Sequence, residues 1–188
     1  MDKVIQKAES ISLDKNDIIK ICEPYPVKAI AYIELMNAND ILDVFGEYDN
    51  VIILYRTKKN YGHWVSLLKY KNTIEYFDPY GEGPDYQLHK SVETVTLQGG
   101  VPIPKLSYLI KDAQNRLKFN FVYNSVKLQN YHQDVNTCGR HSALRIKLSH
   151  MDLHRYITLM INQVFDPDII VTYLTYLIID KDIIDLIN

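Results

Sequence analysis

The sequence is poor in cysteine, with only Cys22 and Cys138 among its 188 residues. Two cysteines cannot build the disulfide framework of a small secreted domain, and no charged, apolar and small-residue leader opens the chain, so we expect a reducing intracellular compartment. A basic excess is also missing, and the formal net charge of -2 gives no electrostatic footprint for nucleic acid. The longest apolar stretch, 169–179, contains two threonines and is shorter than the ~20 residues that cross a bilayer, so we expect no membrane span.

What is present is typical of a folded globular protein. Apolar residues make up 47% of the chain and charged residues 23%, while 15 tyrosines against one tryptophan indicate amphipathic packing surfaces. A domain of about this length buries roughly 70% of its unfolded surface. We therefore expect one domain over residues 1–188, with 1–11 as a loose N-terminal extension and 151–188 as C-terminal helices packed on the domain.

The order of expected elements places strands first and helices last. A short helix should begin at Ser12 or Asp14, because either residue can cap it. Runs of β-branched and aromatic residues predict strands, and apolar periodicity predicts helices. The expected strands are 51–55, 63–70, 73–77 and 118–128; the expected helices are 103–109, 138–150, 153–164 and 167–187; long loops are expected over 81–104 and 129–137.

The second and third strands are separated only by Lys71 and Asn72, which permits a tight hairpin. If Tyr70 faces Thr73 in that hairpin, His63 and the residue after the third strand, Asp78, become diagonal neighbours on one face. Their backbones would then be about 7–8 Å apart, close enough for the side chains to meet. A three-residue loop would reverse this geometry, so the inference depends on the turn.

A cysteine opens one of the expected helices. Asn136 or Thr137 can act as the N-cap, which places Cys138 in the first turn. The unpaired N–H groups and partial positive charge of a helix N-terminus favour a thiolate, and a thiolate is the nucleophilic form of cysteine. The adjacent Gly139 should let a substrate backbone pass close by.

A histidine and a carboxylate complete the chemistry of a thiol hydrolase. His63 could take the proton of Cys138 and later donate it to a leaving amine, while Asp78 holds the imidazole in the required tautomer. A free cysteine is more often a small buried apolar residue, and we assign that role to Cys22, which has no polar helper around it. Trp64 is interpreted as a core anchor.

Two glutamines compete as the donor to a developing oxyanion, a role in which a side-chain N–H joins the Cys138 backbone N–H. Gln129 follows directly on the strand-like residues 126–128, so a rigid element would aim it. Gln133 lies within a loop and is less constrained. We favour Gln129 and keep Gln133 as the alternative.

A zinc site is the rival use of the same side chains. Cys138, His141, His150 and His154 can be written as a Cys/His ligand set. Only one thiolate is available, however, and a helix would separate Cys138 from His150 by about 18 Å, which one ion cannot bridge. We therefore expect neither a metal nor another cofactor.

Four motifs resemble those of the adenain clan of cysteine proteases, which contains the adenovirus maturation protease and the SUMO proteases. The similarity is greatest to the adenain-like proteases of large DNA viruses and virophages, and it covers residues 50–150. The motifs are Tyr-Gly-His-Trp at 61–64, Phe-Asp-Pro-Tyr-Gly at 77–81, Tyr-Asn followed by Leu-Gln at 123–124 and 128–129, and Thr-Cys-Gly-Arg at 137–140.

This resemblance implies an α+β fold, papain-like or adenain-like, in which a mixed central β-sheet is flanked by helices and the nucleophile begins a helix. It also implies site roles: His63 as general base, Asp78 as its orienting partner, Cys138 as nucleophile and Gln129 as oxyanion donor. The interval between glutamine and cysteine is longer than in adenain, which keeps Gln133 as the alternative.

The implied activity is a cysteine endopeptidase that cleaves viral capsid or core precursors after small residues, of the Gly-Gly or Ala-Gly type, during virion maturation. Such an enzyme would act in the cytoplasm or virus factory of an infected cell, or inside the virion. The alternatives are a protease for ubiquitin or a ubiquitin-like modifier, and a non-catalytic binding module. The segment 97–101, Leu-Gln-Gly-Gly-Val, is interpreted as a turn, although it resembles an adenain-type cleavage site.

Overall fold

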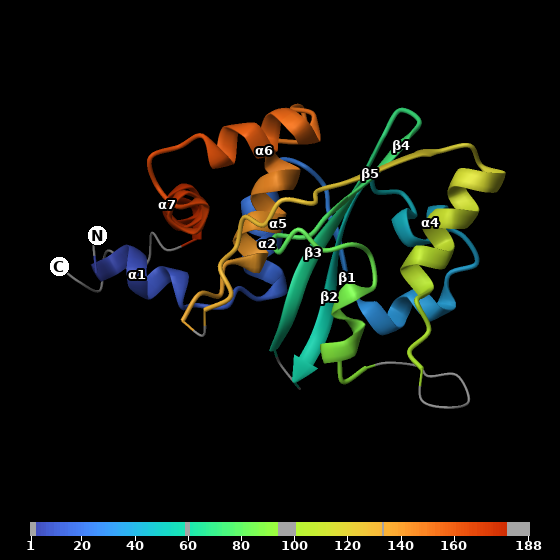
Figure 1. The fold of residues 1–188 in the computed structure, drawn as a ribbon, viewed down its shortest axis with the longest axis horizontal. Coiled ribbons are helices and arrows are strands. Elements are labelled where there is room, and N and C mark those ends of the chain that lie inside the picture. Colours follow the sequence, from blue (N-terminus) through green and yellow to red (C-terminus); the bar gives the residue numbers. More distant parts are fainter. Residues whose placement is uncertain (1–2, 59–60, 94–100, 133, 180–188) are drawn as a thin grey trace.

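The computed structural model describes residues 3–58, 61–93, 101–132 and 134–179, and its centre is a five-stranded β-sheet with helices on both faces (Figure 1). The two outer pairs of strands are parallel and the two inner pairs are antiparallel, so the sheet is mixed. This confirms the predicted α+β fold. In spatial order the strands are β1 (Lys28–Ala31), β2 (Asn50–Lys58), β3 (Tyr61–Tyr70), β4 (Thr73–Phe77) and β5 (Asn120–Tyr123).

Two groups of helices enclose the sheet. One face is covered by α2 (Lys15–Cys22) and α5 (Cys138–Lys147), with α1 (Lys3–Glu9), α6 (Leu153–Ile161) and α7 (Pro167–Ile179) outside them (Figure 1). The other face is covered by α3 (Ile41–Phe45), α4 (Lys105–Arg116) and two 3₁₀ helices, η1 (Tyr32–Asn37) and η2 (Tyr86–Lys90). Within the described ranges, no helix combines the length and the apolar character required to cross a membrane.

Strand β2 is buried on both faces and therefore belongs to both halves of the core. Val51 and Ile53 pack toward α3 and α4, whereas Ile52 packs toward α2 and α5. A strand covered on both sides has an unbroken apolar sequence instead of an alternating one, as its sequence shows. Trp64 of β3 belongs to the second cluster, so its predicted role as a core anchor is confirmed.

The hairpin of β3 and β4 has the predicted register. Tyr70 faces Thr73 and Ser66 faces Phe77, with Lys71 at φ 51° in the turn between them. The two-residue turn fixes the pairing, and the strand then ends directly before Asp78. The sequence therefore predicted correctly how the second half of the hairpin returns toward His63.

The start of α2 is also as predicted. Asp14 accepts hydrogen bonds from the backbone N–H groups of Asn16 and Asp17, and Asp17 in turn accepts one from the N–H of Asp14. This reciprocal arrangement satisfies donors that a helix N-terminus would otherwise leave unpaired.

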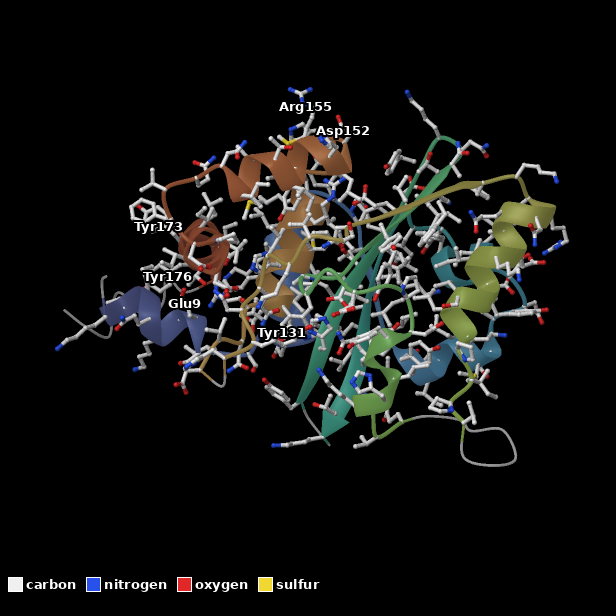
Figure 2. The ribbon with its side chains drawn as sticks, in the orientation of Figure 1. Glu9, Tyr131, Asp152, Arg155, Tyr173 and Tyr176 are labelled. Carbon is white, nitrogen blue, oxygen red and sulfur yellow. The ribbon has the colours of Figure 1, made fainter. Side chains whose placement is uncertain are left out.

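The N-terminal segment corrects one expectation. Residues 3–9, expected within a loose extension, form helix α1, whose Ile5 and Ala8 are buried against Tyr176 of α7. Figure 2 shows Tyr176 pointing toward α1, whereas Tyr173 points away from it. A helix this short depends on tertiary packing, and its partner comes from the far end of the chain, so local pattern did not reveal it.

Several other boundaries differ from expectation. Strand β5 ends at Tyr123 and does not reach 128, because the next residue, Asn124, turns to bind the backbone of Asp78. Helix α4 runs from Lys105 to Arg116 instead of 103–109, and the sequence analysis missed β1, η1 and α3. The helices expected at 138–150 and 153–164 end earlier, at Lys147 and Ile161. Residues 97–100 of the Gly-Gly segment and 180–187 of the last expected helix lie outside the described residues.

Candidate active site

His63 and Asp78 form a buried pair at the end of the hairpin. His63 Nε2 lies 2.7 Å from Asp78 Oδ1, and the Asp78 side chain is fully enclosed. His63 stacks on the ring of Tyr80 with 4.5 Å between centroids, and Tyr80 stacks on Tyr131 in turn. The imidazole is therefore held at its edge by a carboxylate and on its face by an aromatic ring.

Asp78 is fixed through its backbone as well as its carboxylate. Its N–H donates to Asn124 Oδ1 at 2.9 Å and its carbonyl accepts from Asn124 Nδ2 at 2.7 Å. The carboxylate also accepts from the Tyr80 N–H at 2.8 Å and from Gln87 Nε2 at 3.3 Å. These bonds orient the oxygen that faces His63, and Asn124 and Gln87 are contributions that the sequence analysis missed.

The surroundings of His63 favour its charged form. Burial alone would lower the pKa of His63, but the charge and hydrogen bond of Asp78 and a hydrogen bond to Cys138 raise it to about 9. Because Nε2 faces Asp78, the other ring nitrogen, Nδ1, is the atom available to the Cys138 sulfur. A protonated imidazole at neutral pH can therefore stabilise a thiolate beside it.

Helix α5 brings Cys138 to this pair from the far side of the sheet. Cys138 is the first residue of α5, and its Sγ lies 4.0 Å from the carbonyl oxygen of Gly62, the residue before His63. The helix is fixed to β3 by Ser142 Oγ, which donates to the Trp64 carbonyl at 3.0 Å. The structure thus brings together His63, Asp78 and Cys138.

The start of α5 differs from the predicted cap. Thr137 occupies the N-cap position, but its hydroxyl donates to Asp168 of α7 instead of to the first turn. The N-cap side chain therefore makes no capping hydrogen bond to the backbone N–H groups at the start of α5. The expectation for Gly139 was wrong, because a Cβ there would lie 3.2–3.3 Å from Ile18 and Leu13, so core packing and not substrate fills that space.

Asp168 is a second buried carboxylate that the sequence analysis missed. It accepts hydrogen bonds from His141 Nε2 at 3.0 Å, from the N–H of Asn130 at 2.9 Å and from Thr137. Burial would raise the pKa of Asp168, but these bonds and the His141 charge lower it. Asp168 therefore joins α7 to the residues that follow Gln129 and to both sides of Cys138.

Gln129 is buried beside the loop that leads to the nucleophile. Its N–H donates to the Pro79 carbonyl at 2.9 Å, and its side-chain Nε2 donates to the Val135 carbonyl at 3.3 Å. The expected rigid strand before Gln129 is absent from this described part of the chain, and the backbone bond to Pro79 holds the residue instead. Gln133 lies outside the described residues.

A cleft of about 360 Å³ opens beside Cys138. It is lined by residues of β1, β2 and β3 and by the segment that leads into α2. The lining residues are Ser12, Leu13, Asp14, Lys15, Ala29, Ile30, Ala31, Glu34, Leu54, Arg56, Tyr61, Gly62, Trp64 and Cys138.

The histidines of the rival zinc set do not converge on Cys138. His141 is paired with Asp168. His154 lies on α6 and His150 just before it, whereas Cys138 begins α5. Over the described ranges no group of three or more His, Cys, Asp or Glu side chains is arranged to hold a metal ion.

Comparisons with known proteins agree with this fold. No family model matches the chain. It is 32% identical over 155 residues to "Uncharacterized protein V9" of the Sputnik virophage, which covers 82% of this chain and 86% of the relative. Among solved structures, the ASFV pS273R protease superposes with a TM-score of 0.52 at 15% identity, covering 91% of this chain and 69% of that one. The SUMO protease Ulp1 gives 0.47 at 16% identity, with 96% and 86% covered.

Proposed function

Because the chain belongs to the same family as protein V9 of the Sputnik virophage and has the fold of a viral protease, we propose that it is a cysteine endopeptidase. Cys138 is the nucleophile, His63 the general acid and base, and Asp78 the residue that orients His63. The single observation that carries this proposal is the burial of the His63–Asp78 pair, at 2.7 Å, against the cysteine that begins α5.

The reaction follows from the charges in the site. His63, protonated at neutral pH, holds the Cys138 proton, and the thiolate attacks the peptide carbonyl carbon. As the C–N bond breaks, His63 Nδ1 gives its proton to the leaving amine and a thioester remains. His63 then takes a proton from a water molecule as the oxygen of that water attacks the thioester carbonyl. Collapse of this second tetrahedral intermediate breaks the C–S bond, which releases the carboxyl product and restores the Cys138 thiolate beside protonated His63.

The oxyanion of each tetrahedral intermediate needs hydrogen-bond donors. We propose the backbone N–H of Cys138, at the uncapped start of α5, and Nε2 of Gln129. One Gln129 N–H bonds to the Val135 carbonyl, which leaves the second N–H of the amide for the substrate. The hydrogen bond to Val135, three residues before Cys138, connects the Gln129 side chain to the loop that leads to the nucleophile.

We further propose that the substrates are viral capsid or core precursors, cut after small residues during particle maturation. Support for a viral role comes from the virophage relative and from the viral protease that shares the fold. Support for small residues comes from the cleft lining, where Ala29 and Ala31 carry short side chains. The enzyme would then act in the virus factory of an infected cell or in the particle.

The test compares particles made with the active enzyme and with Cys138→Ala. Precursors should persist in the variant, and the new N-termini seen with active enzyme should follow small residues when mapped by mass spectrometry. Cys22→Ala is the matched control, because Cys22 is buried away from the cleft and should leave processing intact. Unchanged processing by Cys138→Ala would refute the assignment. Rapid labelling by a ubiquitin-like modifier with a C-terminal electrophile would instead indicate a modifier protease.

A further inference from the structure

The residues that flank the nucleophile and the histidine are tied to one N-terminal segment, residues 8–13, which we call the N-terminal strap. The ties are hydrogen bonds from side-chain and backbone donors to backbone carbonyls of the strap, so they need no particular strap side chain. The four bonds are Arg140 Nη2 to Ala8 at 3.2 Å, Asn136 N to Glu9 at 2.8 Å, Asn136 Nδ2 to Ser10 at 2.7 Å and Trp64 Nε1 to Leu13 at 3.3 Å.

Asn136 is the centre of this arrangement, because every polar group of its side chain is used. Its Nδ2 donates to the strap, and its Oδ1 accepts a hydrogen bond from the hydroxyl of Tyr61. Tyr61 begins β3 and stands two residues before His63; Asn136 stands two residues before Cys138. The Tyr61–Asn136 bond therefore joins the strand that carries the histidine to the loop that presents the cysteine.

Alternative amino acids would not reproduce these contacts. An aspartate at position 136 would keep the acceptor for Tyr61 and lose the donor to Ser10, and an alanine would lose both. A phenylalanine at position 61 would keep the ring that lines the cleft and lose the hydroxyl, which bonds to Asn136 and also to Ser12. These differences allow the bond to be tested apart from the bulk of either side chain.

We propose that Tyr61 and Asn136 are positioning residues whose hydrogen bond sets the separation of His63 from Cys138. The inference rests on the proposed function and adds to it two residues outside the proposed triad and oxyanion donors. A misplacement of catalytic groups by about 1 Å can lower a rate by about 100-fold, so one bond at this point has a large effect on turnover.

The test measures hydrolysis of a peptide ending in Gly-Gly-aminomethylcoumarin by the full chain. Tyr61→Phe should lower kcat about ten-fold and leave KM within about two-fold, the change expected from one hydrogen bond. Tyr108→Phe is the matched control, since Tyr108 is 65% exposed on α4 across the sheet and should leave both constants unchanged.

A double-mutant cycle identifies the bond itself. Tyr61→Phe should have a much smaller effect in an Asn136→Ala background, where only its bond to Ser12 remains to be lost, but should keep its effect in Asn136→Asp, where the acceptor remains. Additive losses in the Asn136→Ala background would overturn the proposal, as would a rise in KM with unchanged kcat, which would make Tyr61 a substrate contact. The melting temperatures of all variants are measured as well. Full activity of Tyr61→Phe at a lower assay temperature would show that the loss comes from unfolding, and this result would also overturn the proposal.

The rate at which iodoacetamide alkylates Cys138 gives a readout that needs no substrate. In Tyr61→Phe the rate at neutral pH should fall, because the sulfur is less well placed beside His63. An unchanged rate would contradict the inference. If the unmodified chain cleaves no peptide, the proposed function fails, and the alkylation rate still decides the role of Tyr61.

Discussion

Arg145 of α5 and Glu75 of β4 form a fully buried ion pair with two hydrogen bonds, at 2.6 and 2.8 Å. The remaining guanidinium donors reach the carbonyls of Leu148 and Met151, and the ring of Tyr156 lies 5.1 Å away. The pair joins the helix that begins with the proposed nucleophile to the strand that leads into Asp78. It therefore fixes the cysteine side of the site relative to the hairpin side.

Removal of one partner should be severely destabilising. Arg145→Met leaves the Glu75 carboxylate buried and unpaired, and we expect the free energy of unfolding to fall by about 3–5 kcal/mol, measured by urea denaturation. The double variant Arg145→Met/Glu75→Leu should recover most of this loss. Asp112→Asn breaks a solvent-exposed pair with Arg116 on α4 and should produce no resolvable change. Equal effects of the buried and exposed changes would contradict the role assigned to Arg145.

The activity should depend on the protonation of His63. Its pKa is raised from an ordinary 6.5 to about 9, so peptide hydrolysis should fall as the pH rises through about 9 and the imidazolium is lost. In Asp78→Asn, burial still lowers the pKa of His63 but the Asp78 charge no longer raises it. The alkaline limb of the pH profile should therefore move to lower pH. The pH dependence of kcat/KM for both proteins checks this, and an alkaline limb that does not move would exclude Asp78 as the source of the shift.

The same titration contributes to stability, with a definite sign. Because His63 binds its proton more tightly in the folded chain than in the unfolded chain, its contribution is fully present below pH 6.5 and is lost as the pH rises to about 9. His63→Gln should therefore flatten the pH dependence of the unfolding free energy over this window. If the unfolding free energy of the variant changes with pH as steeply as that of the unmodified chain over this range, other groups are responsible.

Asn124 should matter to catalysis although it does not touch His63. Asn124→Ala leaves the N–H of Asp78 without its partner, at a cost of about 1–3 kcal/mol for a buried group, whereas the Asp78 carbonyl keeps its bond from the Gly81 N–H at 2.8 Å. The displaced carboxylate should also lower kcat. Asn120→Ala, at an exposed position at the start of β5, the strand that leads to Asn124, is the control and should change neither the urea midpoint nor kcat. A stability loss with unchanged kcat would limit Asn124 to a structural role.

Gln129 should act mainly on the chemical step. Gln129→Glu replaces the amide donor by a carboxylate, and removal of an oxyanion donor lowers kcat by about 100- to 1,000-fold. KM should change little, because the oxyanion is absent from the ground state. Gln133→Glu is the paired variant that decides between the two glutamines. The reverse result, a loss only in Gln133→Glu, would transfer the oxyanion role.

The parts predicted correctly from sequence are those that depend on neighbours along the chain. The turn at Lys71–Asn72 fixes the hairpin register, Asp14 and Asp17 start α2, and the helix at Cys138 follows from its own periodicity. Each of these signals is local, so a single sequence suffices to see it.

The parts that were missed depend on partners far along the chain. Asn124 binds Asp78, Asp168 binds Thr137, and α1 packs on α7; in none of these cases does the spacing of residues indicate the contact. Thr137 shows the consequence. Local sequence rules predict that its side chain caps α5, but its hydroxyl donates to the distant carboxylate of Asp168 instead. For the same reason the side-chain environment of Gln129 could not be deduced before the loop around Val135 was seen.

The strands of the sheet lie side by side in the order in which they occur in the chain. His63 and Asp78 therefore come from one local hairpin, which can form early, whereas Cys138 arrives on a helix that emerges much later during synthesis. A nascent chain would complete its base and carboxylate long before any thiol stands beside them. On the proposed function, the position of Cys138 late in the chain would thus keep the growing polypeptide inactive until α5 has docked.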